Sequence, residues 1–165
     1  MEFHNGIIIP GFVNCHCHLE LSHMKGSVSQ GSGLGGFIEQ VRNTRANNNE
    51  SIIASAKTAD NDMYTEGVNL CADICNTSFT FNIKRGSRIS YINLLEVFGV
   101  DPERAGHRMA EIVKISEIAG DMNLAFSIVP HSVYSLSLPL FRLLRETNKY
   151  NKVTSIHFME TAGEV

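Results

Sequence analysis

Short apolar runs alternate with segments of helical periodicity along this chain. The runs Phe12–His18, Val68–Ile74, Ile89–Phe98, Leu124–Val129 and Val153–Phe158 are predicted to be strands. Between them, apolar residues recur at the spacing of one helix face. Parallel strands need long, usually helical connections, so this alternation indicates a parallel sheet with crossover helices. The expected fold class is therefore α/β.

The boundaries of the helices follow from the same pattern. Helices are predicted over Leu34–Val41, Ile52–Met63 and Met109–Ile118, and from Ser137 onward. Gly67 suits the position just after the second helix, and Ser137 can cap the last one, with Phe141 and Leu144 facing inward. The segment that follows Ile74 is too polar to assign.

Each predicted strand has, at its carboxyl end, a residue that can do chemistry. These residues are His16 and His18, Asp73, Glu96, His131, and His157 with Glu160 just beyond it. In barrels and open α/β sheets, ligands bind where the carboxyl ends of the strands converge. Five such coincidences in sequence predict a functional site at that end of the sheet.

His16 and His18 form an H-x-H pair in the first strand. Side chains on a strand alternate faces, so both imidazoles point the same way and can reach one metal ion. Two histidines near a strand end can also cap it or face solvent, and the pair alone does not decide. A zinc knuckle built on Cys15 and Cys17 is disfavoured, because the spacing is wrong and no matching second pair follows.

His157 would meet that pair at the mouth of a barrel, although a single histidine at a strand end is more often structural. Glu160 lies in the turn that leaves the strand, where a carboxylate can take a proton from water and return it. The alternative for Glu160 is a carboxylate at a helix start, with Glu164 as a similar candidate.

His131 is followed by hydroxyl residues at a strand end. It can hydrogen-bond a polar substrate or polarise its leaving group. Equally, Ser135 or Ser137 can cap a helix while His131 pairs with the backbone. The residues alone support these two interpretations equally.

Three segments together resemble the amidohydrolase superfamily, in its aminohydrolase and chlorohydrolase branch. Pro10–Ser22 is similar to the branch's PGFVNxHxHLxLS opening, Pro130–Ser135 to its PHAPYS segment, with Val133 in place of proline, and Ser155–Thr161 to its xxHxxE segment. This branch includes deaminases of guanine, adenosine derivatives and aminodeoxyfutalosine. The resemblance implies that His16, His18 and His157 bind one divalent metal ion, usually zinc or iron. It also implies that Glu160 shuttles a proton and that His131 contacts a small-molecule substrate.

The implied function is a metal-dependent hydrolase acting on carbon–nitrogen bonds other than peptide bonds, as a deaminase of an amino-substituted heterocycle. Chlorohydrolase or amidase chemistry of the same family is the alternative within enzymes. An inactive structural or metal-binding fragment is the alternative outside them. Asp73 and Glu96 match no metal-ligand motif and are expected only to support the site.

The chain has 165 residues, whereas a full (β/α)8 TIM barrel takes about 250. We expect it to hold about strands 1–5 of such a barrel, without strands 6–8, their further metal-binding His and Asp, or a β-sandwich domain. Such a fragment is expected to bind metal weakly, to be inactive alone, and to self-associate through its open edges.

The composition excludes some partners. A net charge of -3 gives no electrostatic basis for binding nucleic acid or an anionic membrane. The four cysteines do not suggest the disulfide framework of a secreted protein, so reduced thiols and a cytoplasmic location are expected.

Overall fold

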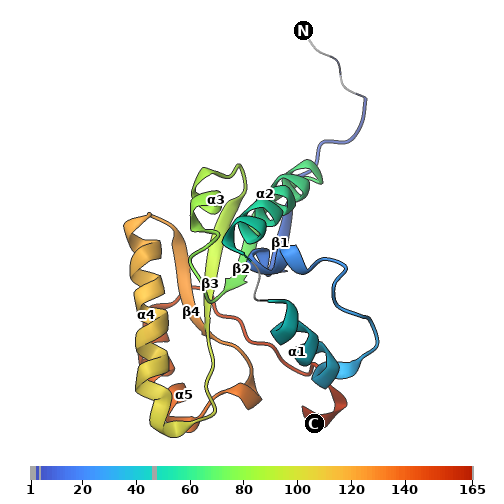
Figure 1. Cartoon of the computed structure of the whole chain (residues 1–165). Coiled ribbons are helices and arrows are strands. Elements are labelled where there is room, and N and C mark those ends of the chain that lie inside the picture. The colour runs from blue at the N-terminus through green and yellow to red at the C-terminus, as the bar shows by residue number, and fades with distance from the viewer. Residues whose placement is uncertain (1–2, 4, 46–47, 165) are drawn as a thin grey trace.

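A parallel sheet of four strands forms the centre of the structure, a computed structural model that describes residues 3, 5–45 and 48–164. Its strands are β1 (Phe12–Cys17), β2 (Val68–Cys75), β3 (Ser90–Val97) and β4 (Ala125–Pro130), in the order β1-β2-β3-β4 (Figure 1). All neighbouring strands are parallel, so their carboxyl ends meet at one edge. The α/β fold class is confirmed.

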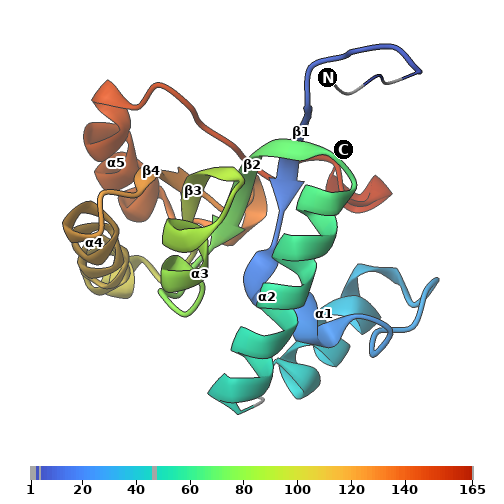
Figure 2. The same cartoon turned by 90° about the horizontal axis from the view of Figure 1, so that it is seen from above.

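Five α-helices accompany the sheet in the described part of the chain: α1 (Gly33–Thr44), α2 (Asn49–Thr65), α3 (Phe81–Gly86), α4 (Ala105–Asp121) and α5 (Leu138–Thr147). The 3₁₀ helices are η1 (Leu19–Met24), η2 (Pro102–Arg104), η3 (Val133–Ser135), η4 (Asn148–Tyr150) and η5 (Ala162–Glu164). Helices α2 to α5 lie along one side of the curved sheet (Figure 2). None of the helices in the described ranges is long and apolar enough to span a bilayer.

The two faces of the sheet have different neighbours, because side chains alternate along each strand. On the helical side, Leu95 and Ile128 pack with Ile112 and Leu140 of α4 and α5 in the largest apolar cluster. On the other face, which we call the inner face, Ile74, Leu94 and Val129 form a separate small cluster together with Ala72 and Ile92. The sheet is therefore apolar on both sides, as in a barrel wall.

The predicted fifth strand is wrong as an element. Residues 153–158 include only an isolated bridge, between Ser132 and His157, and the Phe158 side chain is 65% exposed. The His157 amide donates to the His131 carbonyl oxygen at 2.8 Å, and this backbone hydrogen bond ties the segment to the chain that continues from β4. One bridge does not make a ladder, although it does bring His157 to the carboxyl edge.

Two smaller differences concern the helices. Helix α3 forms in the segment that was too polar to assign, where Phe81 supplies the buried anchor. In α5, Leu140 and Leu144 are buried, whereas Phe141 is half exposed, so the predicted inward-facing Phe141 is wrong. Gly67 directly follows Glu66, the C-cap residue of α2, and has φ +91°, as predicted.

Candidate metal centre

Three imidazoles converge beyond the carboxyl ends of the strands. His16 lies in β1, His18 follows it, and His157 comes from the segment bridged to the end of β4. One ring nitrogen from each lies within 4.8 Å of the other two. The ring centroids are 5.1 Å apart for His16 and His18, 5.0 Å for His16 and His157, and 5.5 Å for His18 and His157.

The chain that follows His18 is anchored by a buried ion pair. The Leu19 amide donates to Asp73 Oδ1 at 2.6 Å, and Lys84 Nζ lies 2.5 Å from Asp73 Oδ2. Both charged side chains have no exposed surface, and Lys84 also donates to Asn93 at 2.7 Å. Burial opposes the charge of Lys84, but the Asp73 carboxylate raises its pKa above the usual value. Asp73 thus faces the helices and fixes the exit from β1.

His157 is oriented by the residue it bridges to. Its Nδ1 lies 3.0 Å from the carbonyl oxygen of His131. A carbonyl oxygen only accepts, so Nδ1 carries the proton and Nε2 keeps a free lone pair. Histidines that bind metals commonly donate their other nitrogen in this way.

The site favours neutral imidazoles. Burial, followed by the neighbouring rings of His16 and His157, lowers the pKa of His18 to about 4. Burial and the nearby His157 also lower the pKa of His16 and of His131. Neutral rings offer the lone pairs that a metal ion requires.

His131 lies beside this group rather than in it. Its Nδ1 is 3.2 Å from Ser132 Oγ and 3.1 Å from Ser135 Oγ, and its ring meets Phe98 at a centroid distance of 5.8 Å. Ser132 and Ser135 form the capping box of η3, so Ser135 bonds within that short turn and does not cap α5. The two hydroxyls give His131 a polar environment. Ser137 is the residue before α5, but its hydroxyl makes no capping bond.

Glu160 follows a tight turn after His157. Met159 has φ +57°, a conformation that residues other than glycine seldom adopt, and its amide donates to Glu164 at 3.0 Å. Tyr134 Oη donates to Glu160 Oε2 at 2.6 Å. The carboxylate that caps the last turn is that of Glu164, not that of Glu160. The negative charge of Glu160 partly offsets the lowering of the pKa of His16 and His131 that burial causes.

A second polar network joins the ends of β2 and β3. Buried Glu20 accepts from Thr77 Oγ1 at 2.6 Å and from Arg45 Nη2 at 2.8 Å. Asn76 accepts from the same Arg45 nitrogen at 2.5 Å and donates to Glu96 Oε1 at 3.1 Å. Burial raises the pKa of Glu20 above its usual value and that of Glu96 to about 7.

This network places Glu96 next to two of the histidines. A carboxylate oxygen of Glu96 and one ring nitrogen each of His131 and His157 lie within 4.8 Å of one another. Sequence reasoning gave Glu96 only a supporting role and missed Asn76 and Tyr134. The available signals were the position of Asn76 directly after β2 and of Tyr134 within the segment after His131.

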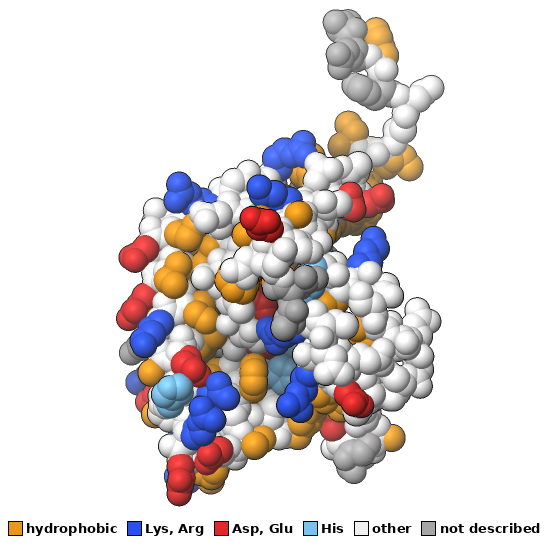
Figure 3. All heavy atoms as spheres, in the orientation of Figure 1, with side chains coloured by type: hydrophobic (Ala, Val, Ile, Leu, Met, Phe, Trp, Pro, Cys, Tyr) orange, Lys and Arg blue, Asp and Glu red, His pale blue; other side chains and the backbone are white. Residues whose placement is uncertain are grey.

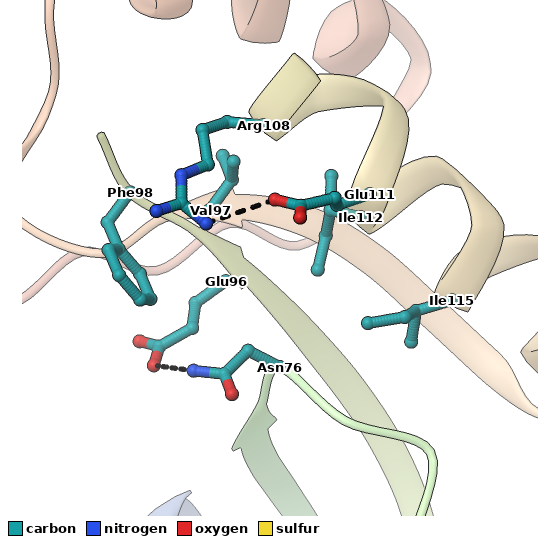
Figure 4. Close-up of a pocket in the computed structure, with 8 residues that line it drawn as sticks. All are labelled: Asn76, Glu96, Val97, Phe98, Arg108, Glu111, Ile112 and Ile115. Atoms are coloured by element: carbon teal, nitrogen blue, oxygen red, sulfur yellow. Dashed lines mark hydrogen bonds and ion pairs between the residues drawn. The ribbon is translucent and has the colours of Figure 1, made fainter. Parts of the chain in front are cut away.

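A pocket of about 300 Å³ opens on the helical side of Glu96 (Figure 4). It is lined by Asn76, Glu96, Val97, Phe98, Arg108, Glu111, Ile112 and Ile115. Arg108 and Glu111 form an ion pair of 3.0 Å at its rim. Acidic and basic side chains are interspersed over the face seen in Figure 3.

Known proteins resemble this chain over nearly its whole length. No family model matches the chain. It is 24% identical over 169 residues to an adenosine deaminase of Helicobacter pylori, covering 99% of this chain and 40% of the relative. It is 27% identical over 179 residues to an aminodeoxyfutalosine deaminase of Nitratiruptor sp., covering 97% of this chain and 40% of the relative. The chain thus spans about 40% of the length of these relatives.

Solved structures give the same picture of the fold. Aminofutalosine deaminase of Helicobacter pylori, in complex with methylthio-coformycin, matches with a TM-score of 0.77 at 23% identity, over 92% of this chain and 38% of that one. Atrazine chlorohydrolase of Arthrobacter aurescens, complexed with zinc, matches with a TM-score of 0.72 at 15% identity, over 90% and 40%. The chain therefore has the fold of part of the TIM barrel of these structures, and the two relatives in sequence named above are deaminases.

Proposed function

We propose that this chain supplies the first strands of a metal-dependent hydrolase that deaminates an amino-substituted heterocycle. The observation that carries the proposal is the convergence of His16, His18 and His157 within 4.8 Å at the carboxyl edge of the sheet. Curated relatives that are deaminases support the reaction class. The remaining strands of the barrel, a further ligating His and Asp, and a β-sandwich domain belong to the same proposal.

The donor set fits one divalent metal ion. Three imidazole nitrogens suit zinc and also iron, and zinc sites of this kind keep a position open for water or substrate. The hydrogen bond from His157 Nδ1 to the His131 carbonyl leaves Nε2 to ligate. When bound, such an ion supplies Lewis acidity and lowers the pKa of water towards neutrality. Zinc is the ion we favour, and it is the ion in the chlorohydrolase complex.

The chain's own residues then hold the substrate and move protons. We assign Glu160 as the group that accepts a proton from the attacking water and returns it to the leaving nitrogen. Its Oε2 accepts from Tyr134 Oη at 2.6 Å, which restrains the carboxylate. His131 contacts the substrate through the ring nitrogen that the two serine hydroxyls leave free.

Hydrolytic dehalogenation is the second candidate reaction. The match to atrazine chlorohydrolase favours it, because a protein with this fold, complexed with zinc, is named for that chemistry. Both reactions place the incoming water oxygen on a ring carbon, so the residues assigned above serve either one.

Zinc affinity tests the proposal. We expect weak binding of about one zinc ion per chain, measured with a chromophoric chelator of low affinity. A His157→Ala variant should bind more than 100-fold more weakly, since losing a residue that only orients a ligand already costs about 10–100-fold. His107→Ala is the matched control, because its side chain is 63% exposed on α4 and pairs with Glu111 of the same helix. Equal zinc affinity of His157→Ala and wild type would refute the metal site.

Activity is a separate measurement. The described strands carry only part of the proposed barrel, so the chain alone should not deaminate adenosine, as followed by its ultraviolet absorbance. Turnover by the chain alone that Glu160→Gln abolishes would show that the missing strands are dispensable.

A further inference from the structure

Glu96 is a buried carboxylate that the proposed function does not use. It is next to last in β3, is only 7% exposed, and its Oε1 accepts from Asn76. Its Oε2 is buried and has no hydrogen-bond partner among the described residues. Among the residues drawn in Figure 4, Glu96 is bonded to Asn76 alone. A buried polar atom without a partner is costly and calls for an explanation, such as a bound ion.

The orientation of this carboxylate is fixed from behind. Arg45 donates to Asn76 Oδ1, which therefore turns its amide nitrogen towards Glu96. Arg45 is itself held by Glu20, which is buried and bonded to the start of the segment after β2. The network thus occupies one oxygen of Glu96 and leaves the other available.

Two imidazoles complete a group around that carboxylate. Glu96, His131 and His157 each offer one ligand atom within 4.8 Å of the other two. The serine hydroxyls engage Nδ1 of His131, and the backbone engages Nδ1 of His157, so Nε2 is the free nitrogen of each ring. Ligand atoms about 2.1 Å from one ion lie at most about 4.2 Å apart, so small side-chain rotations close the group on a cation.

We propose that Glu96, His131 and His157 form a second, overlapping position for a divalent transition-metal ion. Two imidazoles and one carboxylate are a donor set that suits iron(II), manganese(II), cobalt(II) and zinc. The position shares His157 with the three-histidine site, and His157 has one free nitrogen. The two positions are therefore alternatives for one ion, and an ion in the second position withdraws His131 from substrate.

Cobalt(II) is a suitable probe, because its visible spectrum reports coordination. The test uses the full chain in which His16→Ala and His18→Ala remove the first position. We expect this double variant to bind about one cobalt ion per chain, and the further change Glu96→Gln to weaken binding at least tenfold. Glu111→Gln in the same background is the matched control, because Glu111 lines the same pocket but pairs with Arg108.

Circular dichroism establishes that the variants are folded, and Glu96→Gln retains an oxygen to accept from Asn76. A second measurement leaves Glu96 unchanged. In the NMR spectrum of the double variant, bound cobalt should broaden the ring proton signals of His131 and His157. Equal cobalt affinity of the double variant and its Glu96→Gln derivative, or broadening that spares His131, would overturn the second position. Equal affinity of wild type and the double variant would instead overturn the three-histidine site, so the two failures are distinguishable.

Discussion

At the scale of single residues, the buried ion pair of Lys84 and Asp73 holds the chain that follows the metal-centre residue His18. The two charges lie together without exposed surface, and Asp73 also receives the amide of Leu19, the residue after His18. Removing one partner of a buried pair leaves an uncompensated charge, whereas removing both is far less harmful.

We expect Asp73→Asn to lower the free energy of unfolding by about 3–5 kcal/mol, because Lys84 then remains buried without its counter-charge. The double variant Asp73→Asn with Lys84→Met should regain part of that loss. Urea unfolding measures both, and Asp62→Asn, an exposed carboxylate on α2, should change stability by no more than about 0.5 kcal/mol. A double variant less stable than Asp73→Asn would contradict this account.

Residue-level prediction succeeded in part, for a physical reason. The alternation of a strand was enough to place His16 and His18 on one side. His157 reaches the same end of the sheet through an isolated bridge to Ser132, not as part of a fifth strand. The contact of Tyr134 with Glu160 joins side chains 26 positions apart through a turn with a left-handed Met159. No local pattern encodes such a contact.

At the scale of elements, the starts of α2 and α5 differ although both have a residue suited to capping. Asn48 accepts the Ser51 amide at 2.7 Å, as a cap should. Ser137 occupies the same position before α5, but its hydroxyl is buried without a hydrogen-bond partner among the described residues.

Asn48→Ala should therefore lower the free energy of unfolding by about 1 kcal/mol, and Asn48→Asp, which keeps the acceptor, should not. Ser137→Ala should leave stability unchanged or raise it slightly, because no capping bond is lost. Thermal unfolding compares the three variants. A loss at Ser137→Ala as large as that at Asn48→Ala would show that the hydroxyl does cap α5.

The elements that sequence reasoning located well are those with buried apolar runs. The bounds of β1 to β4 lie within about two residues of the predicted ones, and β2, β3 and β4 carry buried apolar residues on both faces of the sheet. The run from Val153 to Phe158 looks equally apolar, but a strand also needs a ladder partner, and only His157 has one. The apolar residues of a segment indicate that it tends to be buried, but they do not indicate whether a neighbouring strand is available to pair with it.

At the scale of the whole molecule, β1 is an edge strand that continues into an extended, apolar arm. Figure 1 shows residues 5–11 running away from the body. Ile7 and Ile8 are at least 90% exposed, and Phe12 and Val13 of β1 itself are more than half exposed. The outer edge of β1 has no neighbour in the sheet. A long, apolar, unpaired edge is a template for pairing with another chain.

We therefore expect the chain to self-associate, with an average mass by light scattering that rises with protein concentration. Ile8→Lys with Val13→Lys should suppress the rise, because charges on an edge strand oppose pairing. Val100→Lys is the control, since Val100 is also exposed but lies beyond β3, away from that edge. A wild-type chain that stays monomeric at high concentration would mean that the arm covers its own edge. A rise that the paired lysines leave unchanged would move the contact to another surface, with the edge of β4 as the next one to examine.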